Sequence, residues 1–299
     1  MKKLSCILAS FFFAFIVTAW GAIEDKPVGL IDSIAGQTDK VIIEHGSDHL
    51  TPVPGFPLFA GDKISVSDEG TKVRISLTGK TELLEIKKDN CQQLGLIQDT
   101  VPPPTVVGNM MSWIGKMATS GNQKKTIKAR TRGAAPKIEL AAFKDNKGRA
   151  IAGEKDWLIS WDGGSSPYCL SLKRVEGDQL VTVFEKSGLE GTTVTLTGLK
   201  LDQGQYHIVI NGGATKTVAT LTLVSKINLP PIPSELRDIV LQENLKKMLY
   251  TVWLYQDNQD EWSFEAMQQA FTASRDYPPA NGVLHAIENG ETIPSSKAM

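Results

Sequence analysis

Short runs in which apolar and polar residues alternate, each ended by turn-forming residues, constrain the fold more than any other feature. In residues 72–77 the apolar members include Val73, Ile75 and Leu77, and polar residues lie between them. A period of two places one row of side chains on a core and the other in water, as in a β-strand. Tight turns such as Gly61-Asp62 separate the runs. The pattern predicts an antiparallel β domain over residues 26–92.

The same stretch carries a set of short motifs. A Val28-Gly29 pair opens it, the turn Leu58-Phe59-Ala60-Gly61-Asp62 follows, and residues 72–80 precede a last apolar run that ends at Ile86. This pattern resembles the FecR domain, the periplasmic part of ferric-citrate-type transmembrane regulators. The resemblance implies an all-β periplasmic module that binds other proteins and has no active site.

Residues 137–226 alternate in the same way and predict a second β domain. Trp161, followed by a Gly-Gly turn and Tyr168, looks like adjacent strands of an immunoglobulin or fibronectin type III sandwich. The segment from Leu199 to Tyr206 resembles the tyrosine corner of that fold, in which a Tyr hydroxyl ties a crossing loop. The resemblance implies an Ig-like β-sandwich. Seven candidate strands are centred near Leu140, Ile159, Leu170, Val183, Val194, Ile208 and Leu221.

The last part of the chain has helical periodicity. We expect a helical region over residues 233–290, with one helix from Ser234 to about Gln256, one beginning at Ser263, and a short one from Asn281 to Glu288. A helical pair of this size cannot bury both of its faces alone, so it must pack on the sandwich or on a partner. Residues 291–299 are predicted to be a disordered tail.

The N-terminus has the pattern of a secretory signal. Lys2 and Lys3 precede an uncharged apolar stretch, and small residues near Gly21 suit cleavage, which predicts a signal peptide over residues 1–22 and a periplasmic or exported protein. The competing interpretation is an uncleaved inner-membrane anchor. Since only Met1 to Lys3 precede the apolar stretch, a sigma-factor role lacks the cytoplasmic segment of the signalling FecR proteins. Export permits a disulfide between Cys91 and Cys169, or two separate thiols.

Residues 98–136 read as a basic, Pro-containing linker with a short amphipathic helix. Between Thr100 and Lys137 the chain has seven basic residues and no acidic one, although its overall formal charge is −1. The helix is indicated by apolar residues at helical spacing, from Met110 to Met117. One interpretation is a solvated linker, and the other is a contact of the 116–137 segment with an anionic surface or a partner groove. Its candidate partner-binding residues are Trp113, Lys124, Lys125, Lys128, Arg130 and Arg132.

No constellation of residues makes a complete catalytic, cofactor or metal motif. His45 and His49 flank a turn, which separates their rings, so a metal site there is disfavoured. Thr78-Gly79-Lys80-Thr81 resembles the end of a phosphate-binding loop, but the required upstream Gly is Arg74, so a hairpin turn is expected. We therefore expect no catalytic, cofactor-binding or metal-binding residue, no cofactor and no enzyme activity.

Together these features predict a mainly β protein, with two antiparallel β domains and a small C-terminal helical region. The function expected is that of an exported, non-catalytic protein-binding module, an envelope scaffold or sensory adaptor, whose partner is an envelope protein. The alternative is a peptidoglycan- or glycan-binding protein, with Trp157 and Tyr168 as candidate exposed aromatic residues. Nucleic acid is not expected as a partner, because the secretory signal points to export.

Overall fold

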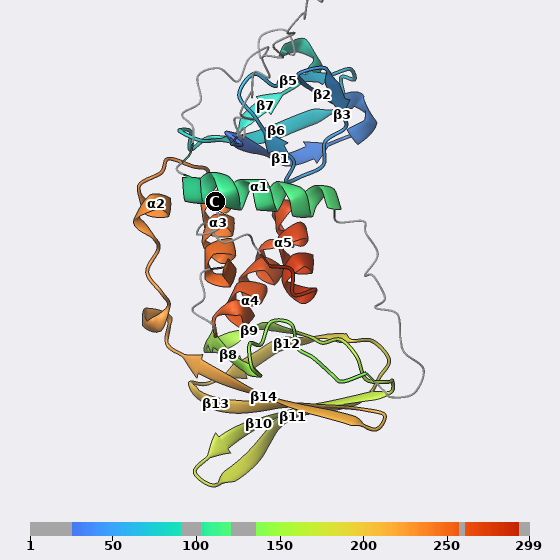
Figure 1. Cartoon of the computed structure of the whole chain (residues 1–299), viewed down its shortest axis with the longest axis vertical. Coiled ribbons are helices and arrows are strands. Elements are labelled where there is room, and N and C mark those ends of the chain that lie inside the picture. Colours follow the sequence, from blue (N-terminus) through green and yellow to red (C-terminus); the bar gives the residue numbers. More distant parts are fainter. Residues whose placement is uncertain (1–25, 91–102, 104, 121–135, 257–260, 293–299) are drawn as a thin grey trace, which may run out of the picture.

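The structure is a computed structural model that describes residues 26–90, 103, 105–120, 136–256 and 261–292. Figure 1 shows three stacked parts: an N-terminal β unit, a layer of helices, and a second β unit. The protein is mainly β, nearly all strand pairs are antiparallel, and the helices C-terminal to the second β unit form a group, as the sequence predicts. The predicted signal peptide lies outside the described residues.

The N-terminal β unit has two antiparallel sheets, with strand orders β4-β1-β6-β7 and β3-β2-β5. The alternation predicted in residues 72–77 is confirmed, because Val73, Ile75 and Leu77 are buried, and they fill a core of their own. Ser76 is also buried, since it is paired with Leu30, which packs against the helices. The strands are β1 (Gly29–Ala35), β2 (Val41–His45), β3 (Asp48–Leu50), β4 (Pro57–Leu58), β5 (Lys63–Val66), β6 (Lys72–Leu77) and β7 (Leu84–Ile86).

The second β unit has a five-stranded sheet of order β11-β10-β13-β14-β8 and a two-stranded sheet of order β12-β9. Six of the seven strands expected from the sequence are present. The exception is the run near Leu140, which forms only an isolated bridge between Glu139 and Asp162. The strands are β8 (Lys147–Ile151), β9 (Gly153–Ser160), β10 (Tyr168–Glu176), β11 (Gln179–Leu189), β12 (Thr193–Leu201), β13 (Gly204–Gly212) and β14 (Thr215–Val224).

The helices are α1 (Thr105–Ser120), α2 (Ser234–Arg237), α3 (Glu243–Gln256), α4 (Ser263–Ala273) and α5 (Pro279–Glu288). The single helix expected from Ser234 to Gln256 is wrong, because the chain leaves the helix after Arg237 and enters another at Glu243. Pro279 begins α5, as suits a residue that needs no hydrogen-bond donor in the first turn. Short 3₁₀ turns occur at Thr38–Lys40, Lys88–Asn90 and Lys226–Asn228.

Helix α1 lies between the N-terminal β unit and the C-terminal helices (Figure 1). The predicted apolar face is confirmed, and it is buried within the chain, where Met110 and Ile114 join the same core as the helices and the second β unit. The expectation that this helix is part of a linker is therefore wrong for residues 105–120. A helix of 16 residues, apolar on a broad face, packs between two layers because both cover its apolar surface.

Close contacts between small residues fix the position of α1. A Cβ atom added to Gly115 would lie 2.6 Å from Cδ of Pro57, and one added to Gly55 would lie 2.7 Å from Cβ of Ala118. In α5, a Cβ at Gly282 would lie 3.1 Å from the backbone nitrogen of Ala118. Such spacing leaves no room for a methyl group unless the layers separate.

Helix α4 covers a strand edge of the second β unit. The Gln268 side chain accepts a hydrogen bond from the Leu158 N–H (2.9 Å) and donates one to the Leu158 carbonyl (2.8 Å). The Glu265 carboxylate accepts the N–H of Ile151 on β8 (3.0 Å). The backbone groups that would otherwise pair with a further strand are thus satisfied by helix side chains. Of the two alternatives left open by the sequence, packing on the second β unit or on a partner, the structure shows the first for α4.

Candidate functional site

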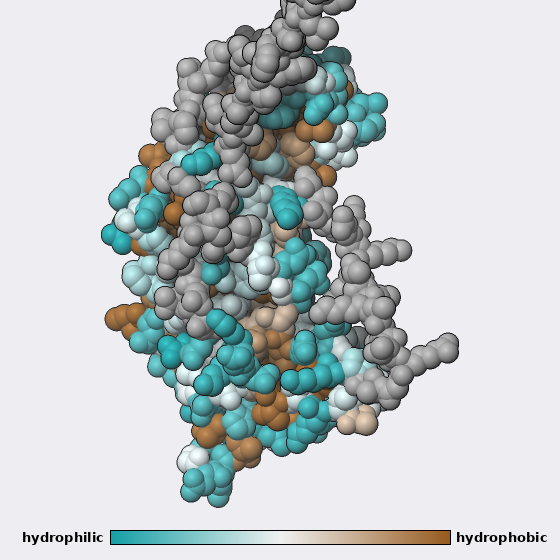
Figure 2. Space-filling model, viewed as in Figure 1, coloured by the Kyte–Doolittle hydropathy of each residue, from teal (hydrophilic) through white to brown (hydrophobic). Residues whose placement is uncertain are grey.

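Strand β11 is the most exposed strand of the second β unit. It has 11 residues, at one end of the five-stranded order, and none of them is buried. Leu180, Val181 and Val183 are 51%, 41% and 39% exposed. Figure 2 shows apolar side chains at the lower end of the molecule, where the β10–β11 hairpin projects in Figure 1. An edge strand with exposed apolar residues presents both backbone groups and side chains to a partner.

The distribution of charge divides β11 into two halves. The first half, Gln179 to Phe184, has no charged side chain, whereas Glu185 and Lys186 lie in the second half. The pairing of β10 with β11 also has two register shifts, and one of them leaves Val183, in the first half, without a direct partner on β10. Charged residues and bulges are the features with which natural edge strands resist pairing. The first half of β11 therefore contains a bulge at Val183 but no charged residue.

The free edge faces away from the helices. Helix α4 contacts β8 and β9, which are the end strands of the two sheets on one side of the β unit. Strand β11 is the opposite end strand of the five-stranded sheet, so its free edge lies on the side that α4 leaves uncovered. In the described part of the chain, β11 is paired with β10 alone.

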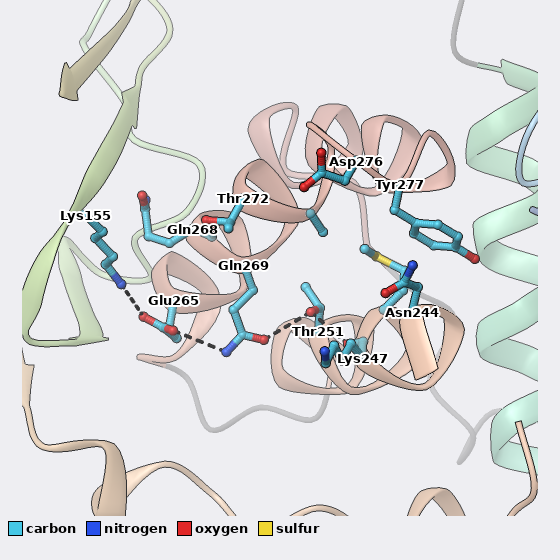
Figure 3. Close-up of a pocket in the computed structure, with 12 residues that line it drawn as sticks. Lys155, Asn244, Lys247, Thr251, Glu265, Gln268, Gln269, Thr272, Asp276 and Tyr277 are labelled. Atoms are coloured by element: carbon cyan, nitrogen blue, oxygen red, sulfur yellow. Dashed lines mark hydrogen bonds and ion pairs between the residues drawn. The ribbon is translucent and has the colours of Figure 1, made fainter. Parts of the chain in front are cut away.

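A second candidate is a cleft of about 470 Å³ between α3 and α4 (Figure 3). Its inner end is a connected chain of polar groups that starts at Lys155 of β9. Lys155 Nζ lies 3.3 Å from Glu265 Oε2, and Gln269 donates a hydrogen bond to Glu265 Oε1 (3.2 Å). The hydroxyl of Thr251 lies 3.1 Å from the side-chain amide oxygen Oε1 of Gln269 and 3.0 Å from the Lys247 carbonyl, and it can donate to either. Glu265 is only 5% exposed, and these donors compensate for the loss of water around its carboxylate.

The mouth of the cleft is polar and exposed. Figure 3 shows Asp276 on one side of the opening and Asn244 and Lys247 on the other. Neither the Asn244 amide nor the Asp276 carboxylate has a hydrogen-bond partner within the part of the chain that the structure describes. Lys247 pairs with Glu243 on its own helix at 3.6 Å. Met248 and Ala273 provide apolar lining.

Two ionisable groups are buried nearby, Asp32 of β1 and Tyr277 between α4 and α5. Burial raises the pKa of the Asp32 carboxyl, and the hydrogen bond from Ser33 and the charge of Arg74 only partly oppose this shift. Burial, and then the charge of Asp32, raise the pKa of the Tyr277 phenol. Among the described residues, Asp32 Oδ1 and the Tyr277 hydroxyl have no hydrogen-bond partner. The Asp32 carboxylate is therefore an energetic cost at neutral pH.

The candidate partner-binding residues predicted from the sequence are not brought together. Trp113 is 4% exposed and packs near Tyr255, with ring centroids 6.3 Å apart, so its predicted contact with a partner is wrong for this structure. Packing between α1 and α3 buries the Trp113 side chain, and helical periodicity alone cannot show this burial. The other five, Lys124, Lys125, Lys128, Arg130 and Arg132, lie outside the described residues. Their contact with a partner stays a prediction.

The histidines and aromatic residues singled out in the sequence have local roles. His45 Nδ1 lies 2.6 Å from Oδ1 of Asp62, whose other oxygen accepts the N–H of Phe59 (2.8 Å) and closes the Gly61-Asp62 turn. Trp157 and Tyr168 are 1% and 6% exposed, so the expectation that they form a glycan-binding face is wrong. No local sequence pattern indicates the cleft, because its lining comes from β9, α3, α4 and the turn that follows α4.

The structure also describes the Gly79 turn and Cys169, and it bears on metal sites and membrane-spanning helices. Gly79, with φ +85°, lies in the expected turn, where Lys80 N–H donates to Leu77 (3.2 Å). Cys169 has a free thiol, and Cys91 lies outside the described residues. In the described ranges there is no group of three metal-ligating side chains, and no helix there is long and apolar enough to cross a membrane.

No protein-family model matches the chain, and no curated protein does.

Proposed function

We propose that the chain is an exported, non-catalytic module that binds another protein of the cell envelope. The observation that carries the proposal is the first half of β11, an uncharged, exposed edge on the side of the β unit that the helices leave open. An extended segment of the partner adds to this edge as a further strand. Backbone hydrogen bonds supply affinity in this mode, and alternate side chains supply specificity.

The proposal includes the two domain resemblances. An Ig-like sandwich over residues 137–226 is supported by the strand orders and by the hydroxyl of Tyr206, which donates to the Asp202 carbonyl (3.0 Å) in the manner of a tyrosine corner. A FecR-like domain over residues 26–92 is supported by the seven short strands and by the Asp62 carboxylate that closes the turn of its motif. Both kinds of domain bind other proteins without catalysis.

The test is cross-linking in the cell envelope, followed by purification of the tagged chain and mass spectrometry. Val183→Lys places a charge on the uncharged half of the edge, where it disfavours strand addition. Val218→Lys is the matched control, because Val218 is 41% exposed on β14, inside the same sheet and away from its edge. The proposal predicts one enriched envelope protein that is captured by the native chain and by Val218→Lys, and lost with Val183→Lys.

Three outcomes would contradict this assignment. Equal capture by both variants would remove β11 as the docking edge. Recovery of peptidoglycan fragments without a protein would favour the wall-binding alternative. If the captured protein is a second copy of the chain, the β11 edge is a self-association surface. The molecular mass in solution would then show a dimer.

A further inference from the structure

We infer that the cleft between α3 and α4 binds a short peptide, with its free ammonium group held by Asp276. The site is separate from β11 and does not depend on the proposed protein docking. Its volume, about 470 Å³, is within the range of roughly 300–1,000 Å³ that is usual for small-molecule sites. Its lining comes from β9, α3, α4 and the turn that follows α4 (Figure 3).

Charge balance limits the class of ligand. The charged side chains of the lining are Lys155, Lys247, Glu265 and Asp276, two of each sign. Lys155 and Glu265 neutralise each other in the wall. A ligand with a large net charge would therefore leave an uncompensated charge in the cleft, whereas a zwitterion or a neutral polar molecule would not.

The polar side chains of the lining that have no hydrogen-bond partner among the described residues indicate how the ligand is held. The carboxylate of Asp276 accepts hydrogen bonds and suits an ammonium group, and the amide of Asn244 suits a peptide unit, since both donate and accept. Lys247, on the rim, suits the carboxylate at the other end of the ligand; its present ion pair with Glu243 is 70% exposed at both side chains and is easily exchanged. Met248 and Ala273 offer apolar surface to an aliphatic side chain.

A sugar fits the same lining less well. Sugar rings commonly pack on the exposed face of an aromatic residue, which gives the apolar side of the ring a contact. The aromatic residue of the lining is Tyr277, which is only 3% exposed, and burial raises the pKa of its phenol, so it offers neither an open ring face nor an ionised oxygen. A short peptide needs no such platform.

The experiment is a titration of the full chain with trialanine, followed by calorimetry and by the amide shifts of Gln269 and Thr272. We expect binding that weakens by about tenfold when the probe is N-acetylated, since one charge-assisted hydrogen bond is lost. Asp276→Asn is expected to weaken trialanine by a similar factor and to make free and acetylated probes equal. Asp238→Asn removes the same charge from an exposed position outside this cleft and is expected to change neither affinity.

The same design applies to the other end of the ligand. Amidation of the trialanine carboxylate is expected to weaken binding in the native chain and to have no effect in Lys247→Gln. The inference is overturned if trialanine does not shift the cleft amides, or if Asp276→Asn binds free and acetylated probes as differently as the native chain does. Binding of N-acetylglucosamine in place of the peptide would overturn it in favour of a sugar site.

Discussion

Replacement of Gln268 by Leu tests whether α4 acts as a substitute strand for the second β unit. Leu158 is paired with Thr195 of β12, but its N–H and carbonyl both bond to Gln268, so they point away from β12. Gln268→Leu removes both hydrogen bonds and leaves two backbone groups buried, because Gln268 is only 2% exposed. Each unsatisfied buried group costs about 1–3 kcal/mol. We expect the free energy of unfolding to fall by about 3 kcal/mol, a large part of the stability of an ordinary domain.

Urea unfolding at pH 7 measures this loss, and hydrogen exchange at the Leu158 amide locates it. Gln269→Leu is the matched control, since it makes the same chemical change on the next residue. The Gln269 side chain bonds only to the side chains of Glu265 and Thr251 beside the open cleft, so its replacement is expected to cost less than about 1 kcal/mol. Equal losses in the two variants, or a Leu158 amide that stays protected in Gln268→Leu, would refute the reasoning.

Three further predictions concern the N-terminal β unit and its junction with the helices. Gly115→Ala is expected to destabilise the chain by about 1–3 kcal/mol in urea unfolding, because the new methyl group would lie 2.6 Å from the Pro57 ring. Gly108→Ala is the control: its methyl group would lie 3.3 Å from the flexible Lys26 side chain, so this change is expected to be neutral or to stabilise α1. Burial raises the pKa of Asp32, so the folded chain binds its proton more tightly than the unfolded chain does, and stability from this group falls as pH rises from the unfolded pKa to the raised folded one. Asp32→Asn is therefore expected to raise the melting temperature at pH 7 and to lose this advantage near pH 3; a lower melting temperature at pH 7 would contradict the assignment. Asp62→Asn is expected to cost about 1–2 kcal/mol in urea unfolding, since a charge-assisted pair with His45 is lost, and an unchanged midpoint would argue against it.

Local sequence patterns were sufficient for most strands. In β6 the alternation reports directly which residues reach the core, because both rows of side chains lie on a regular pleat. The pattern failed at β8, because its buried positions hold the small residues Gly148 and Ala150 in place of large apolar ones. This strand is held by parallel pairing with β14 and by Glu261 and Glu265 near α4, which are distant in sequence.

The same limit applies to the sites. The period of α1 predicts which residues form its apolar face, but it cannot tell whether a partner or the chain itself covers that face. The period therefore makes Trp113 a candidate contact residue, although Tyr255 packs beside it. The cleft depends on Lys155 and Asp276, which come together only when α4 lies across β9. Exposure of Leu180 follows from strand order, which no local pattern contains.

The role of α4 has a consequence for the modular description of the chain. Residues 137–226 by themselves lack the side chains that satisfy Leu158 and Ile151, and they lack Phe264, whose ring packs with those of Phe143 and Trp157. The second β unit is thus completed by the C-terminal helices, and those helices also hold α1 against the N-terminal β unit. Because one layer joins both β units through tight contacts, the direction in which the β11 edge projects is set by the position of the N-terminal unit. If β11 docks a partner as proposed, this continuous packing holds the docking edge at a fixed distance and angle from the N-terminal unit.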